Sequence, residues 1–587
     1  MNSFKDNIEK IFNILVSPIN SIYKYEAINN FKHKLSIGKD ENISLKYYEF
    51  IKGKKETGVI YTPEQISNYM IKNTVSKKDI INNPFIKILD PSCGCGNILI
   101  PCFFYLQNIF KENLEEINKN NNINLKEQYI NKHILDNNLY GFDIDSISIK
   151  ILIIDLFYLT GYYNNNNFKK KDFLIQDINN NFDVYIGNPP YVGHKSVDKK
   201  YSMLLKEKYG HIYKDKGDIS YCFFINALNY SNINSKITFI TSRYFMESKS
   251  GYNLRKYLKE NCNIYKILDF YGIRPFKGAG IDPAIIFIDR SISNKVEVIK
   301  PCKYEKVEMG LFFKQEDKYE NFYVHNSQLK QDGWVLIDDI SKDIINKIEN
   351  KAHKTLKETC TSYQGIITGC DKAFIVNEDT IEKENLEKSI IKSWIKSSYI
   401  NRGKIDFRDS FIIYSNLIEN VDKYPNIIKH IEKYKDKLEN RRECKKKVRK
   451  WYELQWGRNL NIFEEKKIIF PYKSSKNKFY LDKEGTYFSA DVYALTINKE
   501  ENIDYNSLLI ILNSDIYEFY FKTFGKKLGG SLYEYYPSTL MKLKIPMVKI
   551  NKEEDLYKYF NLNDNEIKFI QNKLLINEEV TQKSSII

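Results

Sequence analysis

The alternation of hydrophobic and polar positions divides the chain into parts of different character. Residues 1–55 carry apolar side chains at helical spacing, among them Phe4, Ile8 and Ile11, and predict a helical segment that packs on the next part of the chain. Residues 56–295 alternate short β-branched runs with amphipathic stretches. Such alternation predicts an α/β domain with a mostly parallel sheet and right-handed crossovers.

The predicted strands of this middle part end beside glycines, acids or prolines. After residue 295 the pattern loosens into a charged stretch, which predicts a connector over 296–350 and a second, α+β domain over 351–587. The predicted strands cover residues 86–90, 139–143, 183–187, 236–241, 267–271 and 284–288.

Composition narrows the class of protein. With 587 residues, 42% of them hydrophobic and 14% aromatic, the chain is long enough for two or three globular domains. Lysine and arginine outnumber aspartate and glutamate by 90 to 75, and the resulting charge of +15 suits a polyanionic partner. The nine cysteines and seven histidines lack metal-ligand spacing, and no apolar run is long enough to span a membrane. We therefore expect a cytoplasmic protein without structural zinc, disulfides or a membrane anchor.

One predicted strand ends in a distinctive group of residues. The run 183–187 is followed by Asn188, Pro189, Pro190 and Tyr191. Each proline keeps the preceding residue extended, so an amide and the Pro189 carbonyl are held at the carboxyl end of a strand, where α/β sheets bind ligands. Two fixed acceptors can take both hydrogens of an exocyclic amine beside the flat tyrosine ring. The pattern favours methylation of an aromatic amine, and a strand followed by a proline turn is the plain alternative.

A glycine-rich loop follows the strand at 86–90. Gly94 and Gly96 permit a tight turn and close approach of a ligand beside a helix N-terminus. Leu99 stands where a dinucleotide-binding loop has its third glycine, so the loop alone is weak support for a cofactor site. The next strand ends in Asp143, at the position that binds a ribose diol in such folds, whereas Asp145 is interpreted as a helix-start charge.

Three further segments contain candidate residues. Thr62 and Pro63 form an ordinary helix start. Asp172 can accept a hydrogen bond from an adenine amino group while Phe173 packs on the adenine ring. The glycine-rich loop that begins at Phe276 joins the last two predicted strands and would reach the same face of the sheet as Asn188.

The second half contains cations interleaved with aromatic rings. Between Arg441 and Lys450 there are seven basic residues and one acid, followed by two tryptophans and a further arginine. A second basic and aromatic stretch covers residues 470–476. Cations that reach phosphates and rings that meet bases favour a nucleic-acid partner. For the first stretch alone, a solvated helix face is the alternative.

Taken in order, these stretches resemble the gamma class of DNA adenine-N6 methyltransferases. That family has a Thr-Pro segment, a glycine-rich loop, an acidic strand end, an Asp-Phe pair and Asn-Pro-Pro-Tyr in this order, followed by a target-recognition domain. The match covers residues 57–290, and the second half looks like the family's recognition domains. Both halves look most similar to the CamA-type orphan enzymes among the Eco57I/TaqI-like methylases. The resemblance implies a Rossmann-like, S-adenosylmethionine-dependent methyltransferase domain before the α+β recognition domain.

The resemblance also implies roles for individual residues. Asn188, Pro189 and Tyr191 would hold the target adenine, and Phe276 would stack on its other face. The S-adenosylmethionine site would contain Tyr61, Thr62, Asp90, Cys93, Gly94 and Gly96 at the methionine end, Asp143 at the ribose, and Asp172 and Phe173 at the adenine. Contacts with double-stranded DNA would come from Arg441, Arg442, Lys445, Lys446, Arg449, Trp451, Trp456, Arg458 and Lys473.

The predicted function is therefore site-specific transfer of a methyl group to N6 of adenine in double-stranded DNA. The base would flip out of the helix, and the enzyme would work as a monomer without a metal and without a fused nuclease. Two other functions stay open. A methyltransferase for ribosomal RNA or protein glutamine shares the Asn-Pro-Pro strand end, and duplex DNA would then compete poorly with RNA or protein. A DNA-specificity subunit with a dead site would fail to bind S-adenosylmethionine.

Overall fold

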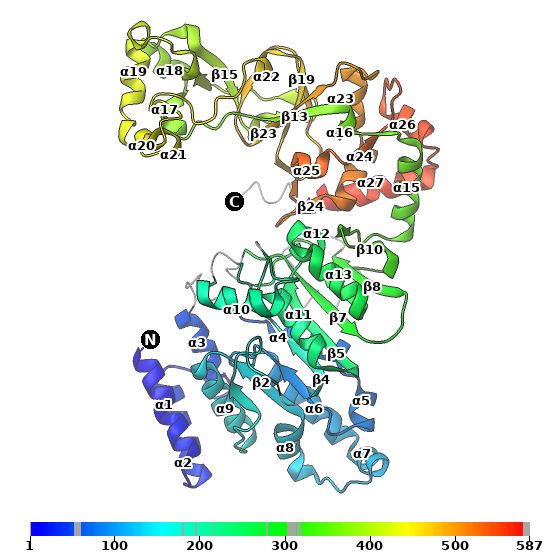
Figure 1. Cartoon of the computed structure of the whole chain (residues 1–587). Coiled ribbons are helices and arrows are strands. Elements are labelled where there is room, and N and C mark those ends of the chain that lie inside the picture. Colours follow the sequence, from blue (N-terminus) through cyan, green and yellow to red (C-terminus); the bar gives the residue numbers. More distant parts are fainter. Residues whose placement is uncertain are drawn as a thin grey trace. The chain divides into compact units, whose positions relative to one another are not determined.

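The computed structural model describes residues 2–51, 60–178, 181–193, 197–214, 217–276, 280–301, 313 and 319–578. It divides into two compact units, Met1–Leu336 and Ile337–Ile587 (Figure 1). Among the residues that the structure describes, no helix is both long enough and apolar enough to cross a membrane.

Within the described part of the first unit, nine strands form one mixed sheet in the order β3-β2-β1-β4-β5-β7-β6-β8-β9. The five strands from β3 to β5 are parallel, and β7 runs antiparallel between β5 and β6. The predicted α/β class with a mostly parallel sheet is confirmed. The strands are β1 (Ile88–Asp90), β2 (Leu139–Asp143), β3 (Phe168–Lys170), β4 (Phe182–Gly187), β5 (Ser231–Ser242), β6 (Asn263–Asp269), β7 (Pro283–Asp289), β8 (Lys295–Pro301) and β9 (Tyr319–His325).

Part of the predicted connector belongs to this sheet. Strand β8 pairs in parallel with β6 and antiparallel with β9, although both β8 and β9 lie almost entirely within residues 296–350. The buried side chains of Val296, Val298 and Val324 alternate along these strands, because each strand turns one face to the core. The sequence does not predict these strands, because the many charged residues of this stretch interrupt the alternation of apolar and polar positions. The short pair β10 (Leu329–Lys330) and β11 (Gly333–Trp334) follows.

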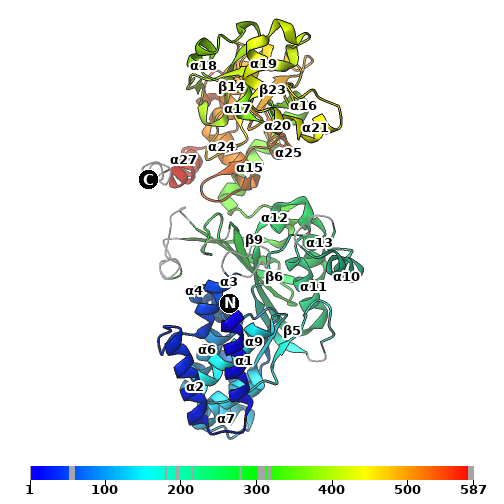
Figure 2. The ribbon, with the colours of Figure 1, turned by 90° about the vertical axis from the view of Figure 1, so that its left-hand side faces the viewer.

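Helices cover both faces of the sheet, as Figure 2 shows. One face carries a core that includes Phe4, Ile66 and Leu99, and the other carries a core that includes Leu205 and Phe224. The N-terminal residues are helical, as predicted. The helices of the first unit are α1 (Asn2–Val16), α2 (Ser21–Lys34), α3 (Ile43–Ile51), α4 (Glu64–Thr74), α5 (Lys77–Asn82), α6 (Leu99–Glu112), α7 (Leu114–Asn121), α8 (Ile130–His133), α9 (Ser146–Thr160), α10 (Lys199–Tyr209), α11 (Ser220–Tyr230), α12 (Tyr244–Glu247) and α13 (Tyr252–Asn261).

Helix α9 illustrates how local sequence sets these elements. The Asp145 side chain accepts a hydrogen bond from the Ile147 main-chain N–H at 3.0 Å and so caps the helix, in agreement with the helix-start charge expected there. The helix ends at Gly161, whose φ of 72° suits glycine. Between these ends α9 is apolar on nearly all sides, because it is buried between the sheet and the N-terminal helices α1 and α3.

The second unit is α+β, as predicted. In its described residues the larger sheets are β13-β23-β19-β21, β14-β18-β15-β22 and β20-β25-β24. Its helices are α15 (Asp339–Lys351), α16 (Leu356–Thr359), α17 (Asp371–Phe374), α18 (Glu378–Lys383), α19 (Pro425–Glu432), α20 (Lys435–Glu439), α21 (Arg442–Lys445), α22 (Asn461–Glu464), α23 (Tyr505–Asn513), α24 (Asp515–Phe524), α25 (Pro537–Leu540), α26 (Glu553–Tyr559) and α27 (Asp564–Glu578).

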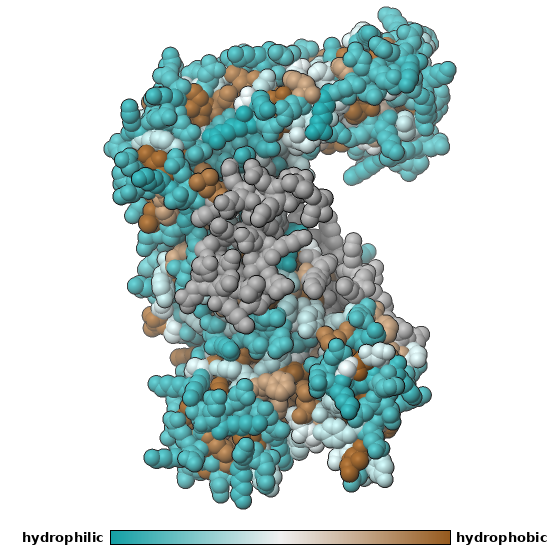
Figure 3. All heavy atoms as spheres, turned by 180° about the vertical axis from the view of Figure 1, so that it is seen from behind, coloured by the Kyte–Doolittle hydropathy of each residue, from teal (hydrophilic) through white to brown (hydrophobic). Residues whose placement is uncertain are grey.

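The strands of the second unit are short, and helix α23 packs beside β19 and β21. They are β12 (Lys354–Thr355), β13 (Cys360–Gln364), β14 (Ile375–Val376), β15 (Ile391–Ile395), β16 (Ile400–Asn401), β17 (Lys404–Ile405), β18 (Phe411–Ile413), β19 (Lys467–Pro471), β20 (Lys473–Ser474), β21 (Tyr480–Asp482), β22 (Tyr487–Phe488), β23 (Val492–Ile497), β24 (Lys526–Lys527), β25 (Tyr533–Glu534) and β26 (Lys544–Ile545). The face seen in Figure 3 is mainly hydrophilic over this unit, with hydrophobic residues scattered among polar ones.

Candidate active site

The Asn188 side chain lies at the carboxyl end of β4, the strand between β1 and β5. Its Nδ2 atom donates to Thr62 Oγ1 at 3.0 Å and to the Ile60 carbonyl at 3.4 Å. Its Oδ1 atom is buried and accepts no hydrogen bond from any residue that the structure describes. Buried polar atoms are nearly always paired. This oxygen is therefore a candidate acceptor for a hydrogen-bond donor that lies outside the described residues.

Gly187, the residue before Asn188, explains how two strand ends come together. A Cβ atom at this position would lie 3.0 Å from Asp90 Oδ1 and 3.2 Å from Pro91 Cδ. A side chain at residue 187 would therefore push the end of β1 away from the end of β4. Glycine keeps the buried Asp90 carboxyl beside the strand that carries Asn188.

The glycine-rich loop adopts the backbone conformation that its glycines permit. Gly94 and Gly96 have φ angles of 51° and 91°, in the left-handed region. A Cβ on Gly96 would lie 2.3 Å from Leu152 Cδ1, so a larger residue fits only if the buried Leu152 side chain shifts. The Gly94 N–H donates to Asp143 Oδ2 at 2.9 Å, which ties the loop to the end of β2. Gly94, Gly96 and Asp143, predicted to share a cofactor site, thus lie in one contiguous group.

Two carboxyl groups of this edge have raised pKa values. Burial raises the pKa of Asp143 to about 6, against the lowering effect of main-chain N–H groups that donate to it. Burial raises the pKa of Asp90 to about 8, and the nearby Asp143 charge adds to this effect, although the Ser92 N–H donates to Asp90 Oδ1 at 3.0 Å. The Cys93 thiol is buried, and burial raises its pKa well above the usual range, so it stays protonated.

Helix α3 supplies a residue of this site that sequence reasoning missed. The hydroxyl oxygen of Tyr48 accepts a hydrogen bond from Asn97 Nδ2 at 2.7 Å, and its ring meets Tyr61 edge to face at 5.4 Å between centroids. A Cβ on Gly94 would lie 2.9 Å from that hydroxyl oxygen. The sequence predicts only packing for this helix, because a tyrosine in an amphipathic helix carries no signal of its partner.

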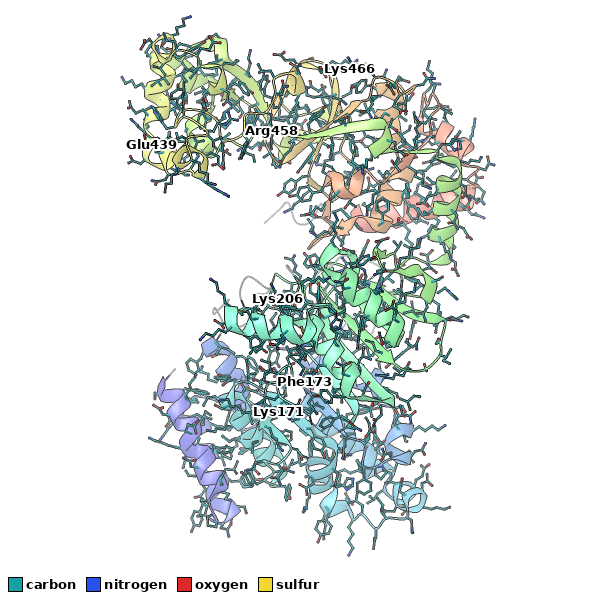
Figure 4. The ribbon with its side chains drawn as sticks, in the orientation of Figure 1. Lys171, Phe173, Lys206, Glu439, Arg458 and Lys466 are labelled. Carbon is teal, nitrogen blue, oxygen red and sulfur yellow. The ribbon has the colours of Figure 1, made fainter. Side chains whose placement is uncertain are left out.

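Asp172 and Phe173 lie on a loop beyond β3. Asp172 Oδ1 accepts from the Leu174 N–H at 2.9 Å and shapes the turn. The Phe173 ring is 2% exposed and stacks on Phe223 at 5.5 Å, in the interior of the unit as Figure 4 shows. The Phe173 side chain is thus covered almost entirely by the protein, so its predicted contact with the cofactor adenine would require the neighbouring side chains to move.

The two aromatic residues predicted to flank the target base lie next to each other. The ring centroids of Tyr191 and Phe276 are 6.1 Å apart with an interplanar angle of 50°. The Tyr191 hydroxyl donates to the Ile240 carbonyl at 3.3 Å. A base stacked between parallel rings needs a separation of about 7 Å, two contacts of about 3.5 Å each. The rings would have to part to admit a base between them, and Lys277–Ala279, which follow, lie outside the described residues.

In the second unit, Arg441 holds its own loop together. Its Nε donates to the Leu438 carbonyl at 3.0 Å, its Nη1 to the Thr368 carbonyl at 3.2 Å, and its Nη2 to the carbonyls of Trp451 and Glu453 at 2.9 Å each. Four main-chain acceptors therefore occupy a guanidinium that was predicted to contact DNA. These hydrogen bonds give Arg441 a structural role, and its contact with DNA stays a prediction.

Arg458 resembles Arg441 in this respect. Its Nε donates to the Gly365 carbonyl and its Nη2 to Gln364 Oε1, both at 2.9 Å (Figure 4). The two arginines fasten the segment 364–368 to the basic stretch that follows Arg441. The sequence does not predict this structural role, because it cannot distinguish an arginine that donates to main-chain carbonyls from one that binds phosphates.

Other members of the predicted DNA-binding set are exposed. Arg442, Lys445, Lys446 and Lys473 are all exposed side chains. Two more members lie together, because the Arg449 guanidinium sits 5.9 Å from the centroid of the Trp456 ring. The Trp451 ring is instead covered by Lys435, whose Nζ lies 5.1 Å from its centroid.

No cluster of three or more histidine, cysteine, aspartate or glutamate side chains suited to a metal ion occurs among the residues with described positions. The sheet edge brings together the glycine-rich loop, the buried Asp90 carboxyl, the partly buried Asp143 carboxyl and the Asn188 amide oxygen, which has no hydrogen-bond partner among the described residues.

Two family models match separate segments of the chain. Residues 137–276 match the Eco57I restriction-modification methylase model, and this segment contains Asp143, Asp172, Asn188 and Phe276. Residues 384–546 match the TaqI-like C-terminal specificity domain, which contains the basic stretch.

Individual relatives and a solved structure agree with these matches. The Type II methyltransferase M.BanIII of Aneurinibacillus aneurinilyticus is 23% identical over 86% of this chain and 93% of its own length. The Type II methyltransferase M.BstVI of Geobacillus stearothermophilus is 24% identical over 83% and 90%. In fold, the chain is similar to MmeI, a Type IIL restriction-modification enzyme solved in complex with DNA, with a TM-score of 0.57 and 15% identity over 88% of this chain and 74% of that one. The chain is thus similar in separate segments to an Eco57I-type methylase and to a TaqI-like specificity domain, and the two relatives described above are named as Type II methyltransferases.

Proposed function

We propose that this protein is a site-specific DNA methyltransferase of the gamma class, similar to the CamA-type enzymes, that methylates N6 of a flipped-out adenine. The observation that carries the proposal is the Asn188 side chain. Its buried Oδ1 atom lacks a partner in the described chain, and it lies at the carboxyl end of a central strand next to the Pro189 carbonyl. These are two acceptors for the two hydrogens of one amino group.

The chemistry of an exocyclic amine explains why two acceptors are needed. The lone pair of adenine N6 is delocalised into the ring, so the nitrogen is a poor nucleophile. Hydrogen bonds from both amino hydrogens to Asn188 Oδ1 and the Pro189 carbonyl pull the nitrogen toward tetrahedral geometry and localise that pair. Fixed acceptors in a buried site stabilise the developing positive charge on the amine without reorganisation. Tyr191 would support the base from one side, with Phe276 on the other.

The residues at the sheet edge fit S-adenosylmethionine. When bound, this cofactor supplies an electrophilic methyl group. Gly94 and Gly96 are left-handed and lie too close to Tyr48 and Leu152 for a larger residue, so the loop keeps a bare main chain beside the end of β1. The carboxylate of Asp143 can accept from a ribose diol, because each of its oxygens has a lone pair beyond those used by the chain. The buried Asp90 carboxyl suits a cationic ammonium, with Tyr61 and Cys93 near the same end.

DNA is the proposed substrate because a separate specificity-domain match follows the methylase segment. Exposed cations and the Arg449–Trp456 pair in that region suit phosphates and bases. A base inside a duplex is out of reach of a buried acceptor, so the adenine would leave the stack at a cost of a few kcal/mol. We further propose that the enzyme acts on DNA as a monomer, in the cytoplasm and without metal.

We also propose that methylation is independent of a fused nuclease. The support is the match to 93% of M.BanIII, which is named as a methyltransferase alone. RM.Eco57I of Escherichia coli, named as both restriction enzyme and methyltransferase, is matched over only 47% of its length. A plasmid incubated with the protein and magnesium ions should remain uncut and unnicked.

The test is transfer of labelled methyl from S-adenosylmethionine to unmethylated genomic DNA, total RNA or a protein extract in parallel. We expect label in DNA, N6-methyladenine as the labelled nucleoside, and one recurrent sequence context in single-molecule sequencing of the product. Label confined to RNA or protein would favour the ribosomal-RNA or protein-glutamine alternative. Binding of DNA without any cofactor binding would favour a specificity subunit with a dead site.

A further inference from the structure

The orientation of the Asn188 amide is decided by its neighbours. An asparagine amide can present either its oxygen or its NH₂ group to a substrate, and the hydrogen-bond network decides which. The Ile60 carbonyl, 3.4 Å from Asn188 Nδ2, can only accept, so the group next to it is the NH₂. The Thr62 hydroxyl oxygen accepts from the same nitrogen at the shorter distance of 3.0 Å. The Ile60 carbonyl thus decides which group of the amide lies on this side. The shorter hydrogen bond to Thr62 holds the amide in that orientation, with Oδ1 pointing away from both acceptors.

The Thr62 hydroxyl is itself held in place. Thr62 is 2% exposed and precedes Pro63, which restricts it to extended conformations. The helix that follows, α4, is fastened to the glycine-rich loop because Ser67 Oγ donates to the Asn97 carbonyl at 2.9 Å. The acceptor for the Asn188 amide thus lies on an extended residue just before a helix that is fastened to the glycine-rich loop.

We propose that Thr62 is a positioning residue for Asn188, whose amide it orients so that Oδ1 faces the target amine. This role differs from the cofactor contact that the family resemblance implies for Thr62, and it rests on the proposed function. If the Asn188 amide were rotated by 180°, its NH₂ group would face the NH₂ group of the target, and two donors cannot form a hydrogen bond with each other. Loss of the orienting acceptor should therefore reduce catalysis at full occupancy of both substrates.

The test compares Thr62→Val with Thr62→Ser. Valine keeps the shape and the extended preference of threonine and removes the hydroxyl, whereas serine keeps the hydroxyl. Single-turnover methylation is measured at saturating S-adenosylmethionine and DNA, and the Kd of S-adenosylmethionine is measured by calorimetry without DNA. We expect the rate of Thr62→Val to fall roughly 10- to 100-fold, as for a misplaced catalytic group, while its Kd stays within about threefold. Thr62→Ser should recover most of the rate.

A matched control is available on α4, the helix that follows Thr62. Thr74 is buried, and its hydroxyl donates to the Met70 carbonyl at 2.6 Å and pairs with Thr238 Oγ1 at 2.7 Å. Thr74→Val removes a buried hydroxyl from α4 in the same way but away from Asn188. It should lower the thermal midpoint and leave the single-turnover rate of the folded enzyme within about twofold of wild type.

The outcomes separate this inference from the proposed function. If the wild-type protein transfers no methyl to DNA, the proposed function is wrong, and the role of Thr62, which rests on that function, is wrong with it. If the wild type transfers methyl and Thr62→Val keeps its rate, the positioning role is overturned, whatever happens to the Kd. A slow Thr62→Ser variant, or an equally slow Thr74→Val variant, would also overturn it, because the defect would then follow from a disturbed α4.

Discussion

The hydroxyl oxygen of Tyr48 on α3 accepts a hydrogen bond from Asn97 Nδ2, 2.7 Å away in the glycine-rich loop. Helix α3 is fixed in turn, since the main-chain N–H groups of Ile43 and Ser44 at its start donate to the buried Asp155 carboxylate at 3.0 and 3.3 Å. The N-terminal helical segment is therefore part of the proposed cofactor site and not merely packed beside it.

Tyr48→Phe should weaken binding of S-adenosylmethionine. The substitution leaves the Asn97 amide without its acceptor and loosens the loop that the cofactor would contact, so we expect Kd to rise by up to roughly 10-fold, the factor that corresponds to a hydrogen bond of about 1.5 kcal/mol. Calorimetry without DNA measures this directly. Tyr158→Phe is the matched control, because that hydroxyl bonds to Asn29 at 2.6 Å, away from the glycine-rich loop. Equal Kd values for Tyr48→Phe and wild type would remove α3 from the cofactor site.

Binding of the cofactor should release a proton near neutral pH. With a pKa of about 8 in the free protein, Asp90 is mostly protonated at pH 7. A bound ammonium favours the carboxylate and lowers that pKa, so the proton leaves on binding and affinity gained from Asp90 increases as pH rises from about 6 to 8.

Calorimetry at pH 7 in two buffers of different ionisation enthalpy measures this proton. The cofactor's own amine also titrates near pH 8, so the decisive quantity is the difference from Asp90→Asn, whose amide does not ionise. Proton release should be smaller in the variant. Equal release by both proteins would mean that Asp90 does not meet the ammonium.

Gly96→Ala should abolish cofactor binding or folding of the first unit. A left-handed backbone costs a residue other than glycine about 1–3 kcal/mol, and the new Cβ would clash with Leu152 at 2.3 Å. Gly193→Ala is the control, because a Cβ there would meet no atom of the described residues within 4 Å. Thermal unfolding and cofactor titration of both variants check the prediction, which fails if Gly96→Ala binds like wild type.

The basic stretch of the second unit should divide into structural and DNA-contacting residues. Arg441→Ala removes the donor for four main-chain carbonyls and should lower the free energy of unfolding by about 2 kcal/mol or more. Substitution of both Lys445 and Lys446 by alanine should leave stability nearly unchanged. It should instead reduce the slope of log affinity against log salt by up to about 2, one for each lost phosphate contact.

Denaturant unfolding and fluorescence titration of duplex DNA at several salt concentrations measure the two effects. The division would be contradicted by an unchanged salt slope in the lysine variant. It would equally be contradicted by an Arg441→Ala protein that is fully stable but has lost DNA affinity.

Strand ends were the most predictable features of the site. Asp90, Asp143 and Asn188 each close a short apolar run, and the carboxyl ends of parallel strands meet at one edge, so the sequence alone indicates that they share a site. The α/β class follows from the same runs. Strand β3 and the pair β8 and β9 were not predicted, because few apolar residues mark β3 and many charges surround the other two.

The hydrogen-bond partners of individual side chains could not be predicted from the sequence. The sequence places Thr62 at a helix start and Tyr48 in an amphipathic helix, and only the fold shows that one meets Asn188 and the other Asn97. Arg441 likewise belongs to a run of cations, yet its guanidinium faces its own main chain. Such contacts depend on residues far apart in the chain, which local patterns do not encode.

Asn188→Ala is the sharpest test of the proposed chemistry. Wild type and variant are each mixed with saturating S-adenosylmethionine and unmethylated duplex DNA in a single turnover, the DNA is digested, and N6-methyladenine is quantified by mass spectrometry. We predict N6-methyladenine from the wild type, a rate at least about 100-fold lower in the variant, and a Kd for S-adenosylmethionine that is nearly unchanged. A variant that methylates adenine at close to the wild-type rate would contradict the role proposed for Asn188.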